Sequence, residues 1–188
     1  MLYIIITLRY KKRLPAGQKN CAGFIELFSI LVYPLLSRIM KSLLNPADSQ
    51  SYINRINCIN PTNKPLWGKM SVDQMLAHCN AGLEKAMATQ PQKRILLGYI
   101  FGPIAKKKLF NNEPFKKGLP TAKDLVRMEH YNFEEEKSKL LRLVEQYTRG
   151  GQAGITKYPH SFFGKLTTAQ WDNLMTKHLE HHLQQFGV

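Results

Sequence analysis

The sequence predicts an all-α protein, a bundle of four main helices with short extra helices, and three observations support this class. Two segments, 71–74 and 167–170, carry the Ser/Thr-x-x-Gln pattern that caps a helix N-terminus. The apolar residues around them recur with the 3.6-residue period of a helix. No segment alternates apolar and polar residues over the length of a strand. In such a bundle, metal sites arise from side chains on facing helices.

The first two helices are expected between residues 45 and 88. Pro46 follows Asn45 and suits the first turn of a helix that runs to about residue 59. Ser71 and Gln74 form the capping pair of the second helix, which continues to about residue 88. Its apolar stripe consists of Val72, Leu76, Cys79, Leu83 and Met87.

The segment 92–110 is apolar, but it contains Gly98, Gly102 and Pro103. Glycine and proline both disfavour a helix interior, so we expect a broken or short helix that ends at a run of three lysines. Turn-forming residues then indicate a loop over 111–120.

The last two helices have clear beginnings. Asn132 caps the third main helix, whose first turn carries three glutamates that suit the positive end of the helix dipole. The Arg-Gly-Gly sequence at 149–151 is expected to end this helix. Thr167 and Gln170 open the last helix, which continues into a histidine-rich segment near the C-terminus.

Residues 1–39 differ in character from residues 40–188, so we expect an N-terminal extension followed by one helical domain. The apolar stretch 22–37 is shorter than the ~20 residues of a membrane helix, and no small-residue cleavage site of a signal peptide follows it. We interpret the extension as translated upstream sequence with the physiological start at Met40. The alternative is a weak membrane anchor through residues 22–37.

The chain of 188 residues has a formal net charge of +14. Such a charge suits a soluble like-charged surface, an anionic membrane, nucleic acid or an anionic small substrate. No repeat interleaves aromatic and basic residues, so we expect no specific nucleic-acid partner. Three widely spaced cysteines without a CxxC pair favour a reducing compartment, and hence a cytoplasmic protein. A homodimer is expected only from the general frequency of homo-oligomers.

The histidines carry the strongest functional signal. His178 and His182 are spaced i, i+4, which places both imidazoles on one face of the last helix. They continue the apolar stripe of Trp171 and Leu174, and His78 on the second helix is the best third ligand. Three imidazoles with one open position form a catalytic zinc site, but nickel, iron and manganese accept the same ligands. Alternatively, the histidines are structural and bind no metal.

Two further histidines leave alternatives open. His160 lies in an aromatic loop, either as a catalytic residue that assists from that loop or as an anchor packed by Phe162 and Phe163. His181 is expected at the rim or in solvent, and it would replace His182 if the helix were rotated. The sequence contains no GxSxG, P-loop, GxGxxG or HExxH motif, so the enzyme classes that use them have no support.

Four strings give the chain a family resemblance: LWGKM at 66–70, QMLAHC at 74–79, FFGKLT at 162–167 and the HxxxH segment at 178–187. With one histidine in the second helix and the pair in the last, residues 40–188 resemble the DinB/YfiT-like superfamily of metalloenzymes, and most closely a branch of unknown function. The resemblance implies an up-down-down-up four-helix bundle.

By the same resemblance, His78, His178 and His182 bind a divalent metal ion. Some members of the superfamily are thiol transferases that use a low-molecular-weight thiol. We therefore expect a metal-dependent transferase or hydrolase acting on a small-molecule substrate, with zinc, nickel, iron or manganese as cofactor and, for thiol transfer, a low-molecular-weight thiol. The alternative is a non-catalytic binding or stress-response module with structural histidines.

Overall fold

The computed structural model describes residues 41–111 and 113–188, so the predicted extension 1–39 lies outside the described residues. Its four main helices are α2 (Pro46–Asn57), α3 (Val72–Ala86), α5 (Phe133–Gly154) and α6 (Thr168–Gln185). The connection between α3 and α5 contains α4 (Leu96–Leu109) and a single 3-10 turn, η2 (Lys123–Leu125). The described residues contain no β-strand, and the predicted all-α class is confirmed.

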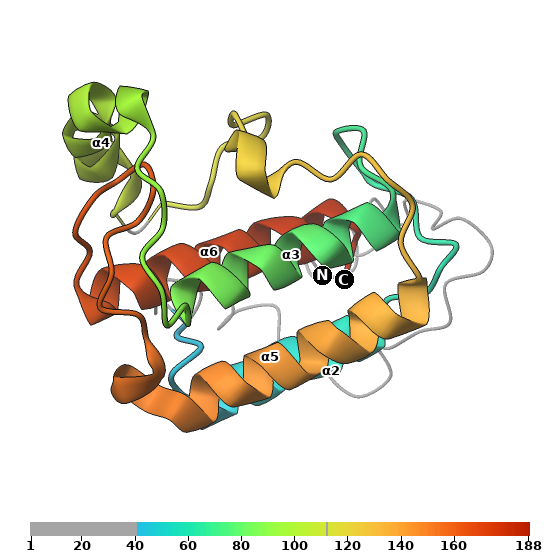
Figure 1. Ribbon diagram of the computed structural model, residues 1–188. Helices are drawn as coiled ribbons and strands as arrows, with labels where there is room; N and C mark the ends of the chain where they lie inside the picture. Colours follow the sequence, from blue (N-terminus) through green and yellow to red (C-terminus); the bar gives the residue numbers. More distant parts are fainter. Residues whose placement is uncertain (1–40, 112) are drawn as a thin grey trace, which may run out of the picture. The chain divides into compact units, whose positions relative to one another are not determined.

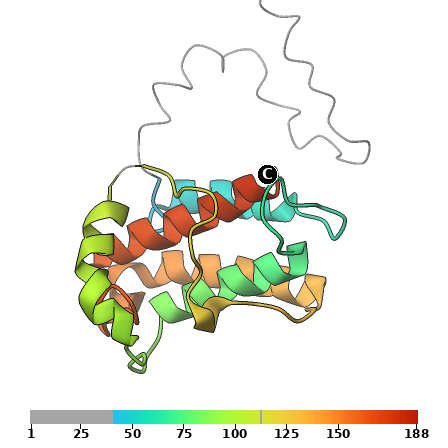
Figure 2. The same ribbon diagram turned by 90° about the horizontal axis from the view of Figure 1, so that it is seen from above.

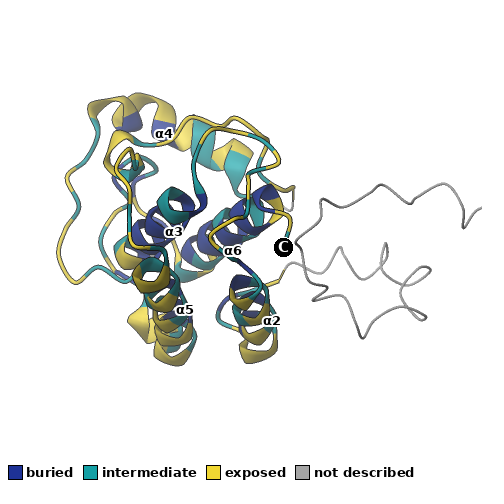
Figure 3. Cartoon of the chain, turned by 90° about the vertical axis from the view of Figure 1, so that its right-hand side faces the viewer, coloured by how far each residue is buried: buried dark blue, intermediate teal, exposed yellow. Residues whose placement is uncertain are grey.

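The four main helices form a bundle in which each helix packs against two others. α3 contacts α5 and α6, and α2 contacts the same two helices from the opposite corner (Figure 3). α2 and α6 run in one direction while α3 and α5 run in the other, which is the up-down-down-up order (Figure 1). Because α3 and α5 are parallel, a long connection must return the chain between them, and it carries α4 across one end of the bundle (Figure 2).

Local hydrogen bonds explain where the helices begin. The Asn45 side chain accepts from the amides of Ala47 and Asp48 at the start of α2. Thr167 and Gln170 cap α6 reciprocally, with distances of 3.0 and 3.2 Å. At α3, the Ser71 amide donates to Gln74 Oε1. The predicted starts of these helices are therefore confirmed.

α5 begins after Asn132, whose side chain accepts from two first-turn amides. The helix is interrupted at Gly151, where φ is +55°. This is the left-handed conformation that glycine adopts most readily at helix ends. The Arg-Gly-Gly stop predicted at 149–151 therefore coincides with the interruption.

The core lies between the four helices and holds α3 and α6 in fixed register. Its fully buried side chains include large residues from every main helix: Tyr52, Ile56, Leu76, Leu140, Tyr147, Trp171, Leu179 and Leu183. Each such side chain contributes about 1.5–3 kcal/mol by leaving water. Cys79 belongs to the same cluster, and burial raises the pKa of its thiol. The core therefore provides a rigid frame for polar groups on α3 and α6.

α4 differs from the expectation of a broken or short helix, because it is one helix of 14 residues with Pro103 inside. Gly98 and Gly102 lie one turn apart and face the backbone of Phe162. The Ile95 amide also donates to the Ser161 carbonyl at 2.9 Å. The glycines that weaken this helix in isolation are thus the residues that let it approach the loop before α6.

Replacing Gly102 by alanine should separate α4 from that loop. The added Cβ would lie 2.4 Å from the Phe162 carbonyl oxygen, so backbone must move. We expect Gly102→Ala to lower the free energy of unfolding by about 1–3 kcal/mol, measured by urea denaturation. Gly150→Ala is the matched control, because nothing lies within 4 Å of its added Cβ. It should be neutral or stabilise by up to about 1 kcal/mol. Equal effects of the two changes would contradict the packing argument.

Candidate metal centre

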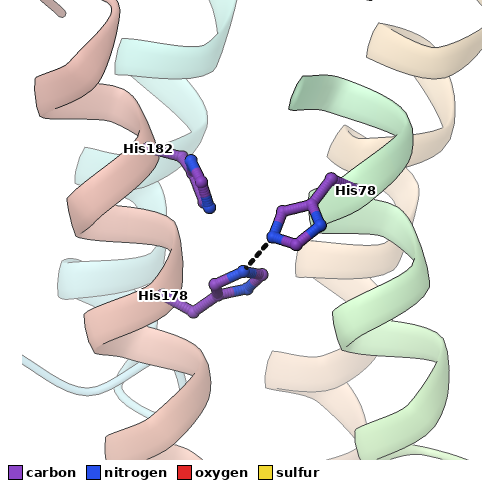
Figure 4. Close-up of side chains that lie close together, drawn as sticks. All are labelled: His78, His178 and His182. Carbon is purple, nitrogen blue, oxygen red and sulfur yellow. Dashed lines mark hydrogen bonds between the residues drawn. The ribbon is translucent and has the colours of Figure 1, made fainter. Parts of the chain in front are cut away.

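Three histidines from two facing helices converge inside the bundle (Figure 4). His78 comes from α3, and His178 and His182 come from successive turns of α6. Their ring centroids lie 4.6–4.8 Å apart, and one nitrogen from each ring lies within 4.8 Å of the others. His78 and His182 are buried, while His178 is partly exposed. The structure thus brings together the three residues that the sequence proposed as ligands.

The tautomer of His78 follows from its hydrogen bond. Its Nδ1 lies 2.9 Å from the carbonyl oxygen of Leu125 in η2. A carbonyl can only accept, so Nδ1 carries the proton and Nε2 presents a lone pair toward His178 and His182. Such a contact to the outer nitrogen is the usual way in which a ligating histidine is oriented.

The tautomer of His182 is fixed by a chain of two hydrogen bonds. The Gln185 amide nitrogen donates to the Trp67 carbonyl at 2.7 Å. The Gln185 Oε1 atom must then be the one that lies 2.8 Å from His182 Nδ1, and this nitrogen is the donor. The Nε2 atom of His182 is therefore also unprotonated and free to bind a ligand.

The third histidine completes a small donor set. The Nε2 atoms of His178 and His78 are 2.7 Å apart, so one must donate to the other when no ion lies between them. Since His78 Nε2 is the acceptor, His178 Nε2 is the donor. Two nitrogens on a tetrahedral zinc ion are about 3.3 Å apart. The His178–His78 pair would therefore open by about 0.6 Å, while nitrogens that lie up to 4.8 Å apart would move closer. With these small adjustments the donor set is compatible with one divalent ion.

Burial keeps these imidazoles neutral at physiological pH. Desolvation is the main cause that lowers the pKa of each of the three, with the neighbouring histidines adding to it for His178 and His182. For His182 the pKa falls to about 3. Neutral imidazole is the form that binds a metal, so the site needs little proton release to take one up.

Several groups around the cluster could not be recognised from the sequence as parts of a site. Gly82 lies one turn after His78 on α3, and a Cβ there would come within 3.1 Å of the His178 ring. Gln185 follows His182 by three residues, and this spacing allows contact on a helix. It was the only feature of the sequence that could have indicated the hydrogen bond to His182. The Leu125 carbonyl had no signal, because any residue type supplies a carbonyl.

The two remaining candidate histidines lie outside the cluster. His160 Nδ1 accepts from the amides of Phe162 and Phe163, and its ring packs against Phe163 and Trp171. These contacts are those of the loop-anchor alternative, and a catalytic role of His160 stays a prediction. His181 lies at the rim, in ring contact with Trp67 and Phe115.

The rim of the centre combines aromatic and basic groups. Trp67 is partly exposed, and its ring lies edge-on to that of His181 with the centroids 5.6 Å apart. Lys117 Nζ sits 4.1 Å from the centre of the Trp67 ring. Phe115 faces His181 from the same loop. A cation beside an aromatic surface suits a small ligand with both apolar and anionic parts.

These features define an all-helical bundle with a buried three-histidine cluster between α3 and α6. The chain belongs to a family of proteins of unknown function, DUF1569, whose model matches residues 39–187. No curated protein and no solved structure matches the chain. Among the described residues, no helix is both long enough and apolar enough to cross a bilayer.

Proposed function

We propose that His78, His178 and His182 bind one divalent metal ion, and that the protein is a metal-dependent enzyme of the DinB-like superfamily. The observation that carries this proposal is the convergence of three neutral imidazoles whose Nε2 atoms face one point. Two of these rings have outer nitrogens fixed by Leu125 and Gln185. Orientation of the outer nitrogen by a carbonyl or amide oxygen is usual for histidines that bind a metal ion.

Thiol transfer and hydrolysis are the two reactions that we propose for this centre. A bound divalent ion supplies a Lewis acid that lowers the pKa of a coordinated thiol or water. The chain's own residues would then orient the reactants, with Trp67 and Lys117 forming the rim beside His181. The rim favours a small electrophile with an anionic group.

Metal content measured by inductively coupled plasma mass spectrometry tests the site. Full-length protein without a His-tag, incubated with zinc, nickel or manganese and then desalted, should retain about one ion per chain. The His178→Ala, His182→Ala double variant should retain almost none, since one remaining imidazole is a weak ligand. His181→Ala is the matched control, because it removes an adjacent imidazole on α6 that is not in the cluster. Circular dichroism checks that the variants are folded.

Equal metal content in the wild type and the double variant would overturn the proposal. If the metal is lost in the double variant, the wild type is next assayed for thiol transfer to an aryl chloride and for ester hydrolysis. Activity that depends on the metal supports an enzyme. A site that binds metal but accelerates neither reaction would instead favour the non-catalytic binding module.

A further inference from the structure

The outward side of α4 is apolar, the reverse of an ordinary surface helix. Leu96, Ile100 and Ile104 are spaced four residues apart, and they and their neighbours are exposed to solvent (Figure 3). They are between 52 and 79% exposed: Leu96, Leu97, Tyr99, Ile100, Phe101 and Ile104. The inward side consists of Gly98 and Gly102, which pack on Phe162. Contiguous exposed apolar surface of this kind marks an interaction site.

Basic residues flank this apolar face at both ends of the helix. Lys93 and Arg94 precede the helix, and Lys106, Lys107 and Lys108 form its last turn. No Asp or Glu occurs between Glu84 and Glu113 in the sequence. On the helical wheel, Lys107 and Lys108 fall on the same side as Ile100, Ile104 and Phe101. The surface is therefore apolar in its centre and cationic at its ends.

An open pocket adjoins α4 and adds to this charge. It has a volume of about 420 Å³ and lies between α4 and the loop before α6. Arg94, Tyr99 and Lys165 are among its lining residues, and the Arg94 guanidinium stacks on the Tyr99 ring at 4.6 Å. Arg94 Nη1 also donates to the His160 carbonyl at 3.2 Å, which holds this cation at the pocket wall, where its charge attracts phosphate.

We propose that α4 docks the protein on the surface of a membrane rich in anionic phospholipid. Its apolar face would enter the boundary between headgroups and acyl chains, while the lysines and Arg94 contact lipid phosphates. A helix of 14 residues is about 21 Å long, too short to span the hydrocarbon layer but long enough to lie in the interface. Tyr99 and Phe101 are residue types that favour this depth.

Charge also argues against a second copy of the chain as the occupant. In a two-fold pairing of α4 with α4, an antiparallel arrangement would place Lys106–Lys108 opposite Lys93 and Arg94 of the partner copy. A parallel arrangement would place lysines opposite lysines. Both juxtapose like charges without an acidic residue in the segment to offset them. An anionic bilayer complements the same charges.

Co-sedimentation of the full chain with vesicles tests the proposal. One set of vesicles consists of phosphatidylcholine alone, and the other of equal parts phosphatidylcholine and phosphatidylserine. Wild type should bind the second set and be released by high salt. The double variant Ile100→Gln, Ile104→Gln should bind the anionic vesicles at least about tenfold more weakly, because two apolar side chains no longer leave water on binding. Lys107→Glu with Lys108→Glu should weaken it roughly thirtyfold or more.

Lys64→Glu with Lys69→Glu is the matched control, because it changes the net charge equally at exposed lysines outside α4. This variant should keep most of the binding to anionic vesicles. Wild-type binding by the Ile100, Ile104 variant would overturn the proposal, and so would equal losses in the two lysine variants. Light scattering without lipid measures whether the protein forms a dimer. A dimer that the isoleucine variant dissociates, with no vesicle binding, would assign the face to a second copy and also overturn the proposal.

Discussion

Adding zinc to the metal-free protein is expected to raise its thermal unfolding midpoint by about 8–16 °C. A ligand present at a thousand times its dissociation constant stabilises the folded state by about 4 kcal/mol. For a chain of this size, each kcal/mol shifts the midpoint by about 2–4 °C. Differential scanning calorimetry at pH 7.5, with and without zinc, measures the shift. Zinc is expected to stabilise only the folded state, because the three imidazoles lie close together only in the folded chain.

A graded set of variants connects this shift to the geometry of the centre. His178→Ala should abolish most of it, because it removes one nitrogen of the donor set. Gln185→Ala keeps all three ligands but frees His182 Nδ1. Loss of such an orienting group typically weakens metal affinity 10–100-fold, so zinc should stabilise this variant by about 1.4–2.7 kcal/mol less and the midpoint should shift correspondingly less. His181→Ala should retain the full shift. The same shift in all three variants would place the stabilising zinc elsewhere.

The parts of this site that were predictable from the sequence depend on contacts close along the chain. The capping pairs Ser71 with Gln74 and Thr167 with Gln170 join residues three positions apart, so their pattern suffices. The same holds for His178 and His182, whose spacing fixes a common face once the segment is a helix. His78 was assignable because it lies on a second helix that must face the core.

The unpredicted parts depend on distant backbone. The Leu125 carbonyl orients His78 across 47 positions of sequence, and carbonyls carry no sequence signal. A broken or short helix was expected at α4 because its two glycines and Pro103 were judged by helix propensity alone. Their partner, the Phe162 backbone, is about 60 residues further on, and it converts a propensity cost into close packing.

Acid should destabilise the metal-free protein before its carboxylates are protonated, and His160 should contribute to this effect beside the three histidines of the cluster. Burial, aided by Lys85, lowers the pKa of His160 to about 4. A histidine in the unfolded chain has a pKa of about 6.5. Between these values the unfolded state binds the proton and the folded state does not, so stability falls as the pH falls. The difference corresponds to about 3 kcal/mol, present above pH 6.5 and lost by about pH 4.

His160→Asn isolates this contribution. Asparagine retains an oxygen that can accept from the Phe162 and Phe163 amides, which now donate to His160 Nδ1. In the presence of a chelator, urea denaturation at a series of pH values gives the slope of unfolding free energy against pH. Between pH 4.5 and 6, the variant should lack up to about 1.4 kcal/mol per pH unit of the wild-type slope, the value for one proton.

His130→Asn is the matched control for this slope. It removes an imidazole whose side chain is 94% exposed and which lies outside the loop of His160. A wild-type slope in His160→Asn would show that the ring is already solvated or protonated in the folded state. It would then not be the partly buried anchor that packs against Phe163 and Trp171, and its catalytic alternative would gain support. If only His160→Asn reduces the slope, this part of the acid sensitivity belongs to the loop before α6. His160 accepts from the amides of Phe162 and Phe163 in that loop, and α4 packs on Phe162.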